Sequence, residues 1–251
     1  MIQLSFPFIA AMVGVLSQIA LAVPSAKHPA SCVFPNPPSS KNVVYKHPYI
    51  VRANEHFDGK NLRYSRGVKC GEQSNGNSKH AVFILEHGGT ISNVVIGADQ
   101  NEGIHCKGPC TILNAWFEDV CEDAITLLQN SGTTNIIGGG ARNAVDKVVQ
   151  HNGGGKVNIE SFCGINFGKL YRSCGDCPHQ MMREVHIDSV TAQNGKALVG
   201  LNANYGDVAR IDTGTNSYTN LRSACDTFKG NNKGSKVTRV QVNKHNDNCI
   251  F

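Results

Sequence analysis

Residues 90–96 read TISNVVI, and residues 111–117 read TILNAWF. In both runs apolar residues, many of them β-branched, are interspersed with Asn or Ser, as expected of a strand with one buried face. Similar runs recur at residues 81–85, 133–137, 157–162, 185–190 and 208–212. No segment of about twelve residues carries a helical apolar stripe. The sequence therefore predicts many short strands and almost no helix.

The runs recur at a nearly constant distance. Successive equivalent positions are separated by 21, 22, 23, 28 and 24 residues. The positions taken as equivalent are Ile91, Ile112, Thr134, Val157, Val185 and Ala209. Such a step is typical of a solenoid with several short strands per coil, and 26 glycines can supply its corners. We predict an all-β fold, a single-stranded right-handed parallel β-helix. A β-sandwich is the alternative, but its Asn-Gly hairpin signals are few.

The N-terminus is typical of an export signal. Residues 1–22 are almost wholly apolar, carry no charged side chain and end in Ala20-Leu21-Ala22, a small-x-small cleavage pattern. A membrane anchor is the alternative, but polar residues and a proline interrupt the run. We predict a secretory signal peptide at 1–22, one β-helix domain at 23–251, and a secreted, extracellular protein.

Cysteine usage points to the same compartment. Ten cysteines, an even number in a chain with an export signal, allow up to five disulfides. The pairs Cys106-x3-Cys110 and Cys174-x2-Cys177 could instead be half zinc sites or a redox pair, but with the nearby histidines they follow no standard finger spacing. We predict disulfides that staple coils and loops, and the connectivity stays open.

The net charge of +5 suggests a polyanionic partner. Nucleic acid is a poor match, because the lysines are dispersed, there is one Trp, and no recognition helix is apparent. Acidic polysaccharide suits an exported protein better. We expect a monomer that binds neither nucleic acid nor, in its mature form, a membrane.

Charged residues between positions 97 and 177 form an acidic and a basic group. The acidic group is Glu102, Asp119, Glu122 and Asp123, and the basic group is Lys147, Lys169 and Arg172. Glu102 and Glu122 are 20 residues apart, and Lys147 and Lys169 are 22 apart, each close to one coil. Because adjacent strands lie about 4.8 Å apart, these side chains are expected to stack on one face of the solenoid.

The acidic group is suited to a hard cation. Calcium takes about six to eight oxygen ligands, mostly carboxylates and carbonyls. On a straight strand Asp119 and Glu122 would point to opposite faces, so the chain must bend at Val120-Cys121, where the Val120 carbonyl could also become a ligand. The spacing is not that of an EF-hand loop. A solvated acidic corner is the alternative.

The basic group is suited to proton abstraction. A lysine that is partly desolvated and beside other cations has a lowered pKa, which makes it a candidate general base. Three exposed cations that only bind an anion are the alternative. His105, His151 and His179 could each supply the base instead, although a lone His in a repeat protein more often has a structural role.

Four ordered runs resemble the signatures of the secreted pectate lyases of polysaccharide lyase family three. They are IGADQNEGIHC at 96–106, EDVCEDA at 118–124, DKVVQHNGG at 146–154 and FGKLYRSCG at 167–175. The resemblance implies a parallel β-helix, calcium dependence, and β-elimination on de-esterified polygalacturonan of the plant cell wall, giving 4,5-unsaturated oligogalacturonides.

The resemblance also implies roles for single residues. The positions that match the calcium-binding region are Glu102, Asp119, Val120 (through its carbonyl), Glu122 and Asp123. Lys147, Lys169 and Arg172 match the basic catalytic residues. We predict that Lys147 is the base, that Lys169 and Arg172 bind uronate carboxylates and depress the Lys147 pKa, and that Arg172 is the second candidate for the base.

Two other functions fit the same fold. A β-helix polygalacturonase would hydrolyse the polymer with carboxylates as acid and base. A non-catalytic module would bind polygalacturonate with calcium and release no product.

Overall fold

The computed structural model describes residues 28–71 and 77–251, so the predicted signal peptide at 1–22 lies outside the described residues. Within them, regular structure is almost entirely β, with eighteen strands and three short 3-10 helices, η1 (Ser39–Lys41), η2 (Ser78–His80) and η3 (Ala203–Tyr205). None of the described helices is long and apolar enough to cross a membrane.

The strands follow one another with short connections. In chain order they are β1 (Asn42–Val44), β2 (Tyr49–Val51), β3 (His56–Ser65), β4 (Ala81–Leu85), β5 (Thr90–Ile96), β6 (Glu102–Cys106), β7 (Thr111–Phe117), β8 (Asp123–Leu127), β9 (Thr133–His151), β10 (Gly155–Glu160), β11 (Cys163–Ser173), β12 (Arg183–Asp188), β13 (Thr191–Asn202), β14 (Val208–Ile211), β15 (Ser217–Thr219), β16 (Cys225–Lys229), β17 (Thr238–Val242) and β18 (Cys249–Ile250).

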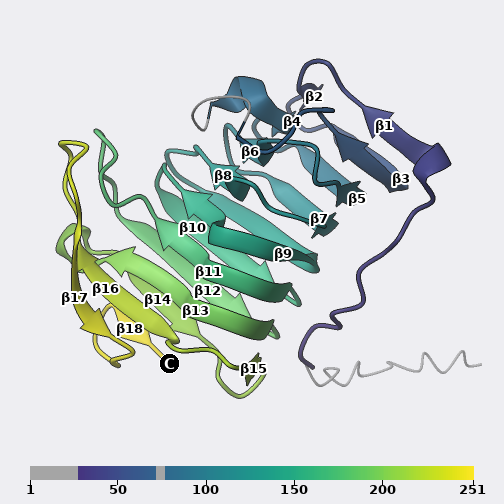
Figure 1. Ribbon diagram of the computed structural model, residues 1–251. Helices are drawn as coiled ribbons and strands as arrows, with labels where there is room; N and C mark the ends of the chain where they lie inside the picture. Colours follow the sequence, from purple (N-terminus) through teal and green to yellow (C-terminus); the bar gives the residue numbers. More distant parts are fainter. Residues whose placement is uncertain (1–27, 72–76) are drawn as a thin grey trace, which may run out of the picture.

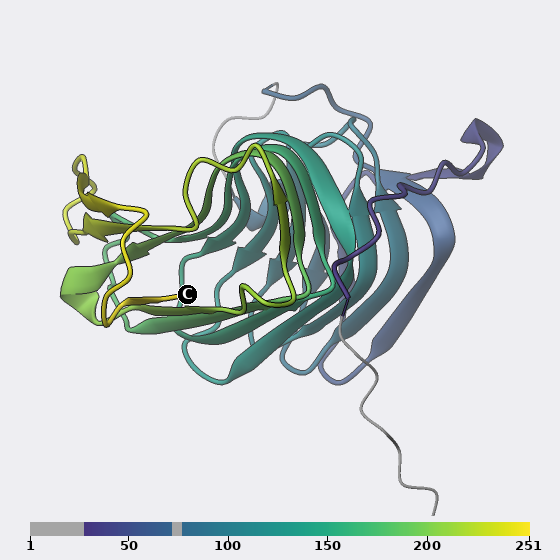
Figure 2. The same ribbon diagram turned by 90° about the horizontal axis from the view of Figure 1, so that it is seen from below.

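Parallel pairing between successive coils makes a solenoid, which confirms the predicted parallel β-helix (Figure 1). Seen along its axis, the coil encloses a continuous interior (Figure 2). Its three walls can be named from the pairings. The A wall contains β2, β4, β6, β8, the ends of β9, β11 and β13, and β16. The B wall contains the starts of β3, β5, β7 and β9, then β10, β12, β14 and β18. The C wall contains β1, the ends of β3, β5 and β7, the middle of β9, the starts of β11 and β13, and β15. Among the described pairings only β16 with β17 is antiparallel.

The predicted repeat register is correct except at one step. Ile91 pairs with Ile112, and Thr134, Val157, Val185 and Ala209 are aligned on successive coils. However, Ile112 pairs with Ile136 rather than with Thr134. The reason is that isoleucine fills the interior stack, whereas the buried Thr134 hydroxyl hydrogen-bonds to Gln129 beside the loop before β9.

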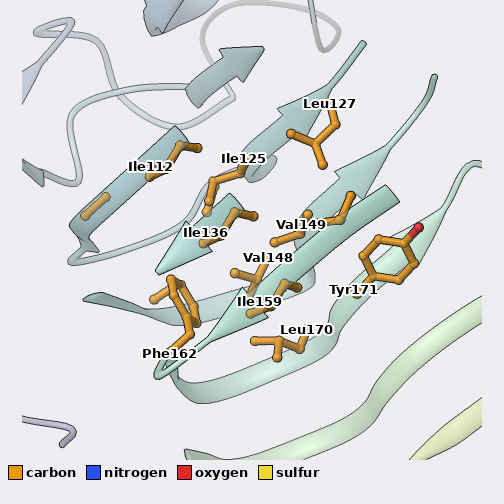
Figure 3. Close-up of a cluster of buried hydrophobic side chains, with 14 of the residues drawn as sticks. Ile112, Ile125, Leu127, Ile136, Val148, Val149, Ile159, Phe162, Leu170 and Tyr171 are labelled. Carbon is orange, nitrogen blue, oxygen red and sulfur yellow. The ribbon is translucent and has the colours of Figure 1, made fainter. Parts of the chain in front are cut away.

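The core consists of side chains stacked coil upon coil (Figure 3). On the B wall one such stack contains Ile112, Ile136, Ile159 and Ile187. On the A wall another contains Ile104, Ile125, Val149 and Tyr171. All eight are at most 1% exposed. Full burial of such a side chain contributes about 1.5–3 kcal/mol, so the interior stacks fix which residues of each strand face outward.

Five disulfides confirm the predicted stapling. The pairs are Cys32–Cys163, Cys70–Cys121, Cys106–Cys110, Cys174–Cys177 and Cys225–Cys249. They leave no thiolate in the described chain for zinc, and they suit an oxidising compartment.

The N-terminal segment from residue 28 runs along the outside of the coil (Figure 2). Cys32 ties it to β11, and the Phe34 ring packs edge-on against Trp116 at a centroid distance of 4.8 Å. The segment therefore covers a part of the C wall and stabilises it from outside.

Asparagines form the corner between the C and A walls. Asn143, Asn166, Asn194 and Asn220 have φ between 53° and 62°, which asparagine tolerates better than most residues. Each amide from Asn166 onward donates to the amide oxygen one coil earlier, at 3.0–3.2 Å. On the B wall Asn158 likewise donates to the amide oxygen of Asn135, at 2.8 Å.

Candidate active site

The A wall carries a row of charged residues, one from each of four successive coils. Asp123 pairs with Lys147, and Lys147 pairs with Lys169, so the predicted stacking of the two lysines is confirmed. The pairing of Ile104 with Ile125 places Glu102 opposite Asp123, not opposite Glu122. The acidic step is therefore 21 residues rather than the 20 that the sequence suggested.

A hollow of about 340 Å³ lies over the basic end of this row. Its floor comes from the A wall, with Asp146, Lys147, Gln150, Lys169 and Arg172. Phe228 of β16 and residues 235–237, which precede β17, form one side. The hollow thus brings together all three predicted basic residues.

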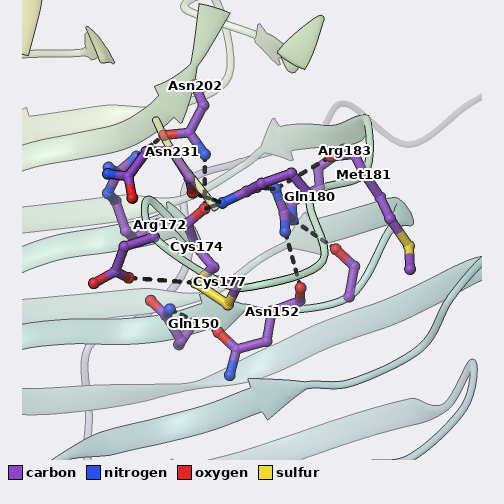
Figure 4. Close-up of a disulfide and its surroundings, with 12 residues drawn as sticks. Gln150, Asn152, Arg172, Cys174, Cys177, Gln180, Met181, Arg183, Asn202 and Asn231 are labelled. Atoms are coloured by element: carbon purple, nitrogen blue, oxygen red, sulfur yellow. Dashed lines mark hydrogen bonds between the residues drawn. A yellow bond between two sulfur atoms is a disulfide. The ribbon is translucent and has the colours of Figure 1, made fainter. Parts of the chain in front are cut away.

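Arg172 is fixed more firmly than the lysines. Its side chain is 6% exposed, its guanidinium donates to Asn202 Oδ1 at 3.2 Å, and it lies 4.1 Å from the centroid of the Phe228 ring. Asn202 in turn donates to the carbonyl of Cys174, which is disulfide-bonded to Cys177 (Figure 4). Burial lowers the pKa of Arg172 to about 10. Arg172 is thus a positioned cation, suited to hold a carboxylate.

Lys147 lies between two carboxylates. Its Nζ is 2.5 Å from Asp146 Oδ2 and 3.5 Å from Asp123 Oδ1. Burial by itself lowers the pKa of Lys147, but the two carboxylates outweigh it and raise the pKa overall. The predicted depression of this pKa is therefore wrong in this structure, because sequence spacing did not reveal the carboxylates beside the amine.

Lys169 shows the shift that was predicted for Lys147. Burial lowers its pKa, and the charges of Arg172 and Lys147 add to that effect. Its ion pair with Asp146 Oδ1, at 3.6 Å, offsets the shift only in part. Lys169, and not Lys147, is therefore the amine whose pKa is lowered.

The acidic end of the row is suited to a hard cation. Glu102 is 1% exposed and accepts a hydrogen bond from His105 Nε2 at 3.1 Å. The side chain of Asp123 is 12% exposed, and its buried Oδ1 makes no hydrogen bond to the described residues. Burial raises the pKa of Asp123 to about 7 despite the opposing field of Lys147. Adjacent buried carboxylates match the donor chemistry of calcium, and the Lys147 amine at 3.5 Å is the ion-pair partner of Asp123 Oδ1.

The other predicted metal residues lie in the bend between β7 and β8. This bend confirms the expected break at 120–121. Asp119 and Glu122 are exposed, whereas Val120 is buried. Asp119 lines a different hollow, of about 570 Å³, together with Glu118 and Arg142. Across the residues described, no three His, Cys, Asp or Glu side chains converge as a metal cluster.

The three histidines considered as bases do not line the hollow at Lys147. His151 is buried, with hydrogen bonds to the Tyr171 hydroxyl and the Gly154 carbonyl, and burial lowers its pKa to about 3. His105 supports Glu102. His179 lines a separate hollow beside Cys177.

Asp146, the residue that bridges Lys147 and Lys169, was not predicted from the sequence. Adjacent residues of a regular strand point to opposite faces, and the register of β11 with β9 shifts between Phe167 and Lys169, so the spacing carried no signal for Asp146. The sequence prediction also missed Phe228 and the segment before β17, for which the period gave no signal because β17 leaves the repeat.

The fold and the row define a class: a parallel β-helix protein that carries stacked carboxylates and amines on its A wall. Comparison with known proteins makes this specific. The family model described as pectate lyase matches residues 33–235. The chain belongs to the pectate lyase family, and is thus a polysaccharide lyase that acts on pectate.

Named relatives agree. The chain is 50% identical over 207 residues to probable pectate lyase D of Neosartorya fischeri, covering 82% of this chain and 86% of the relative. It is 48% identical over 218 residues to pectate lyase H of Emericella nidulans, covering 87% and 83%. Membership of this family favours a lyase over both the hydrolase and the non-catalytic module.

Solved structures show the same fold. The catalytic domain of pectate lyase PelI from Erwinia chrysanthemi superposes with a TM-score of 0.67 at 33% identity, over 80% of this chain and 92% of that one. PelI in complex with tetragalacturonic acid gives a TM-score of 0.62 at 32% identity, over 80% of this chain and 66% of that one.

Proposed function

We propose that this lyase is calcium-dependent and cleaves de-esterified polygalacturonan of the plant cell wall by β-elimination, giving 4,5-unsaturated oligogalacturonides. One observation carries the proposal: along the A wall two carboxylates are followed by two amines, one per coil. A cation held by the carboxylates and a base supplied by an amine would then face the same stretch of substrate.

The residues around the row supply the chemistry that the elimination needs. The base accepts the C5 proton, a C4–C5 double bond forms, and the C4–O bond to the leaving sugar breaks, with that oxygen taking a proton from solvent. When bound, calcium would neutralise the uronate carboxylate and stabilise the charge that develops at C5. Glu102 and Asp123 would hold the ion, with Asp119, Glu122 and the Val120 carbonyl as further ligands from the bend.

Lys147 is the proposed base because it adjoins the acidic end of the row. Asp123, one of the two carboxylates that raise its pKa, would face the cation, so a bound cation would weaken the field of that carboxylate at the amine. Lys169 and Arg172 would bind uronate carboxylates. Arg172 was the second candidate for the base from the sequence, and Lys169 joins it as a candidate because its own pKa is lowered.

Chemical rescue separates the two lysines. If Lys147 is the base, Lys147→Ala should lower kcat at least about a hundredfold, and small primary amines in solution should restore part of it. Lys169→Ala should mainly raise KM and show no rescue. The reverse pattern would assign the base to Lys169.

Ultraviolet absorbance of the unsaturated product tests the reaction itself. Purified protein with polygalacturonate and calcium should generate this absorbance, and a chelator should abolish it. Reducing ends without absorbance would indicate hydrolysis, and activity unchanged by chelation would contradict calcium dependence.

We also propose that the mature protein is secreted, acts outside the cell and begins after residue 22. The disulfides support an oxidising compartment. Sequencing the N-terminus of protein from culture medium tests the cleavage site.

A further inference from the structure

Another hollow, of about 420 Å³, lies at the corner between the C and A walls. Its lining includes Val145, Asn166, Asn194, Lys196, Asn220 and Arg222. Val145 is followed directly by Asp146, which lines the hollow at Lys147. The two hollows are therefore neighbours on the surface of the coil.

Two cations of this second hollow come from the next two coils, each one residue before the position in register with Lys169. Lys196 precedes Ala197, which pairs with Lys169. Arg222 lies one coil further, because its backbone N–H donates to the Gly195 carbonyl at 3.1 Å. Lys147, Lys169, Lys196 and Arg222 thus come from four successive coils, each about 4.8 Å from the next.

These two side chains are unsatisfied cations. Both are exposed, and neither forms a side-chain hydrogen bond or an ion pair with the described part of the chain. Like charges gathered in a hollow attract an anion and hold it more strongly than isolated surface charges do. Lys147, by contrast, is paired with two carboxylates, so the second hollow retains more of its positive charge than the surroundings of Lys147 do.

The neutral lining is suited to a sugar. The ladder of Asn166, Asn194 and Asn220 presents amide groups at the hollow, where they can exchange hydrogen bonds with hydroxyls. Val145 is 81% exposed and offers an apolar surface to a pyranose ring. Carboxylate, hydroxyl and apolar ring face are the three recognisable parts of a galacturonate residue.

We propose that this hollow is a distal subsite, in which Lys196 and Arg222 bind the carboxylates of galacturonate residues lying beyond the cleavage centre. The inference rests on the proposed function, and it implies that the polymer crosses the coils along the solenoid axis. The subsite would strengthen binding of long chains and leave the chemical step unchanged.

The test is the double variant Lys196→Gln/Arg222→Gln. The control is Lys156→Gln/Arg210→Gln, which removes the same two residue types and the same charge from the B wall, where their side chains are 41% and 56% exposed and both pair with Glu184. KM and kcat are measured on polygalacturonate and on trigalacturonate. Retention of wild type and both variants in gels of de-esterified or highly methyl-esterified pectin is measured in parallel, and thermal unfolding checks that both variants fold.

We expect the subsite variant to raise KM for the polymer about tenfold, with kcat and the trigalacturonate constants unchanged, and to lose retention only in the de-esterified gel. Equal effects in both variants would show that the loss of net charge, and not of this hollow, raises KM, and would overturn the subsite. Unchanged KM and retention, or an equal loss on trigalacturonate, would overturn it too. An inactive wild type would contradict the proposed function instead, and gel retention would still decide the subsite.

Discussion

At the scale of single residues, Asp123 and Lys147 are neighbours that both favour their protonated forms. Burial raises the Asp123 pKa to about 7, and nearby carboxylates raise the Lys147 pKa. Near neutral pH Asp123 therefore gains and loses its proton, whereas Lys147 keeps its own.

Asp123 should make the stability of the cation-free protein depend on pH. Its folded pKa of about 7 exceeds the ordinary 3.8, so between these values the folded state binds the extra proton, and stability falls as pH rises. Asp123→Asn should remove this contribution. The difference in free energy of unfolding between variant and wild type should change by up to about 1.4 kcal/mol per pH unit.

Urea unfolding from pH 4 to 8 with a chelator measures this difference. Parallel curves for the two proteins across that range would contradict the raised pKa.

Gly200 leaves room for two of the basic side chains. A Cβ there would lie 3.1 Å from Arg172 Cδ and 3.2 Å from Lys169 Cδ. Gly200→Ala should displace both and lower kcat/KM about ten- to a hundredfold, with little change in the melting temperature. Gly214→Ala is the control, because there the nearest atom, Asp212 Oδ1, is 3.4 Å away. Equal activity of the two variants would show that the space is not needed.

Residue types and spacings predicted which residues form the site better than they predicted the pKa shifts of those residues. The 22-residue step placed Lys147 beside Lys169 correctly. The acidic partner of Glu102 was misplaced by one residue, since the exposed bend before β8 hides the true register. The direction of the Lys147 pKa shift depended on contacts with Asp123 and Asp146, and such contacts require coordinates.

At the scale of elements, the corners are fixed by asparagine. Asn114 has φ 50°, donates to Asn93 Oδ1 at 2.9 Å and accepts from the Trp116 indole at 2.7 Å. Asn114→Ala should lower the free energy of unfolding by about 3 kcal/mol, from the lost hydrogen bonds and left-handed strain. Asn114→Gly should cost about 1 kcal/mol less, because glycine avoids the strain. Urea unfolding measures both, and equal losses would mean that strain is unimportant.

The strands were predictable because their apolar periodicity follows directly from the interior stacks. By contrast, the β16–β17 pairing was not, since β17 is antiparallel and largely exposed, with Val240 and Val242 facing outward. Because β17 has no buried face, its sequence shows no apolar alternation from which the pairing with β16 could be predicted.

At the scale of the whole molecule, positive charge should assist capture of the polymer. The chain carries a net charge of +5, and its basic row lies along one wall. Attraction between exposed charges is screened within about 10 Å at 0.1 M salt. Raising sodium chloride from about 0.02 to 0.2 M at fixed free calcium should therefore increase KM several-fold, with kcat nearly constant. Initial rates measure this, and a salt-independent KM would contradict electrostatic capture.

The overall architecture was the most predictable feature, because a recurring step of about 21 to 28 residues constrains every coil at once. The single error, Thr134 for Ile136, shifted one coil and left the fold unchanged.

The row on the A wall receives one side chain from each coil. Insertion or duplication of an entire coil during evolution would thus lengthen the substrate track by one position while the hydrophobic stacks rejoin on either side. Related proteins could in this way gain or lose binding positions for the polymer one coil at a time, while the catalytic residues stay unchanged.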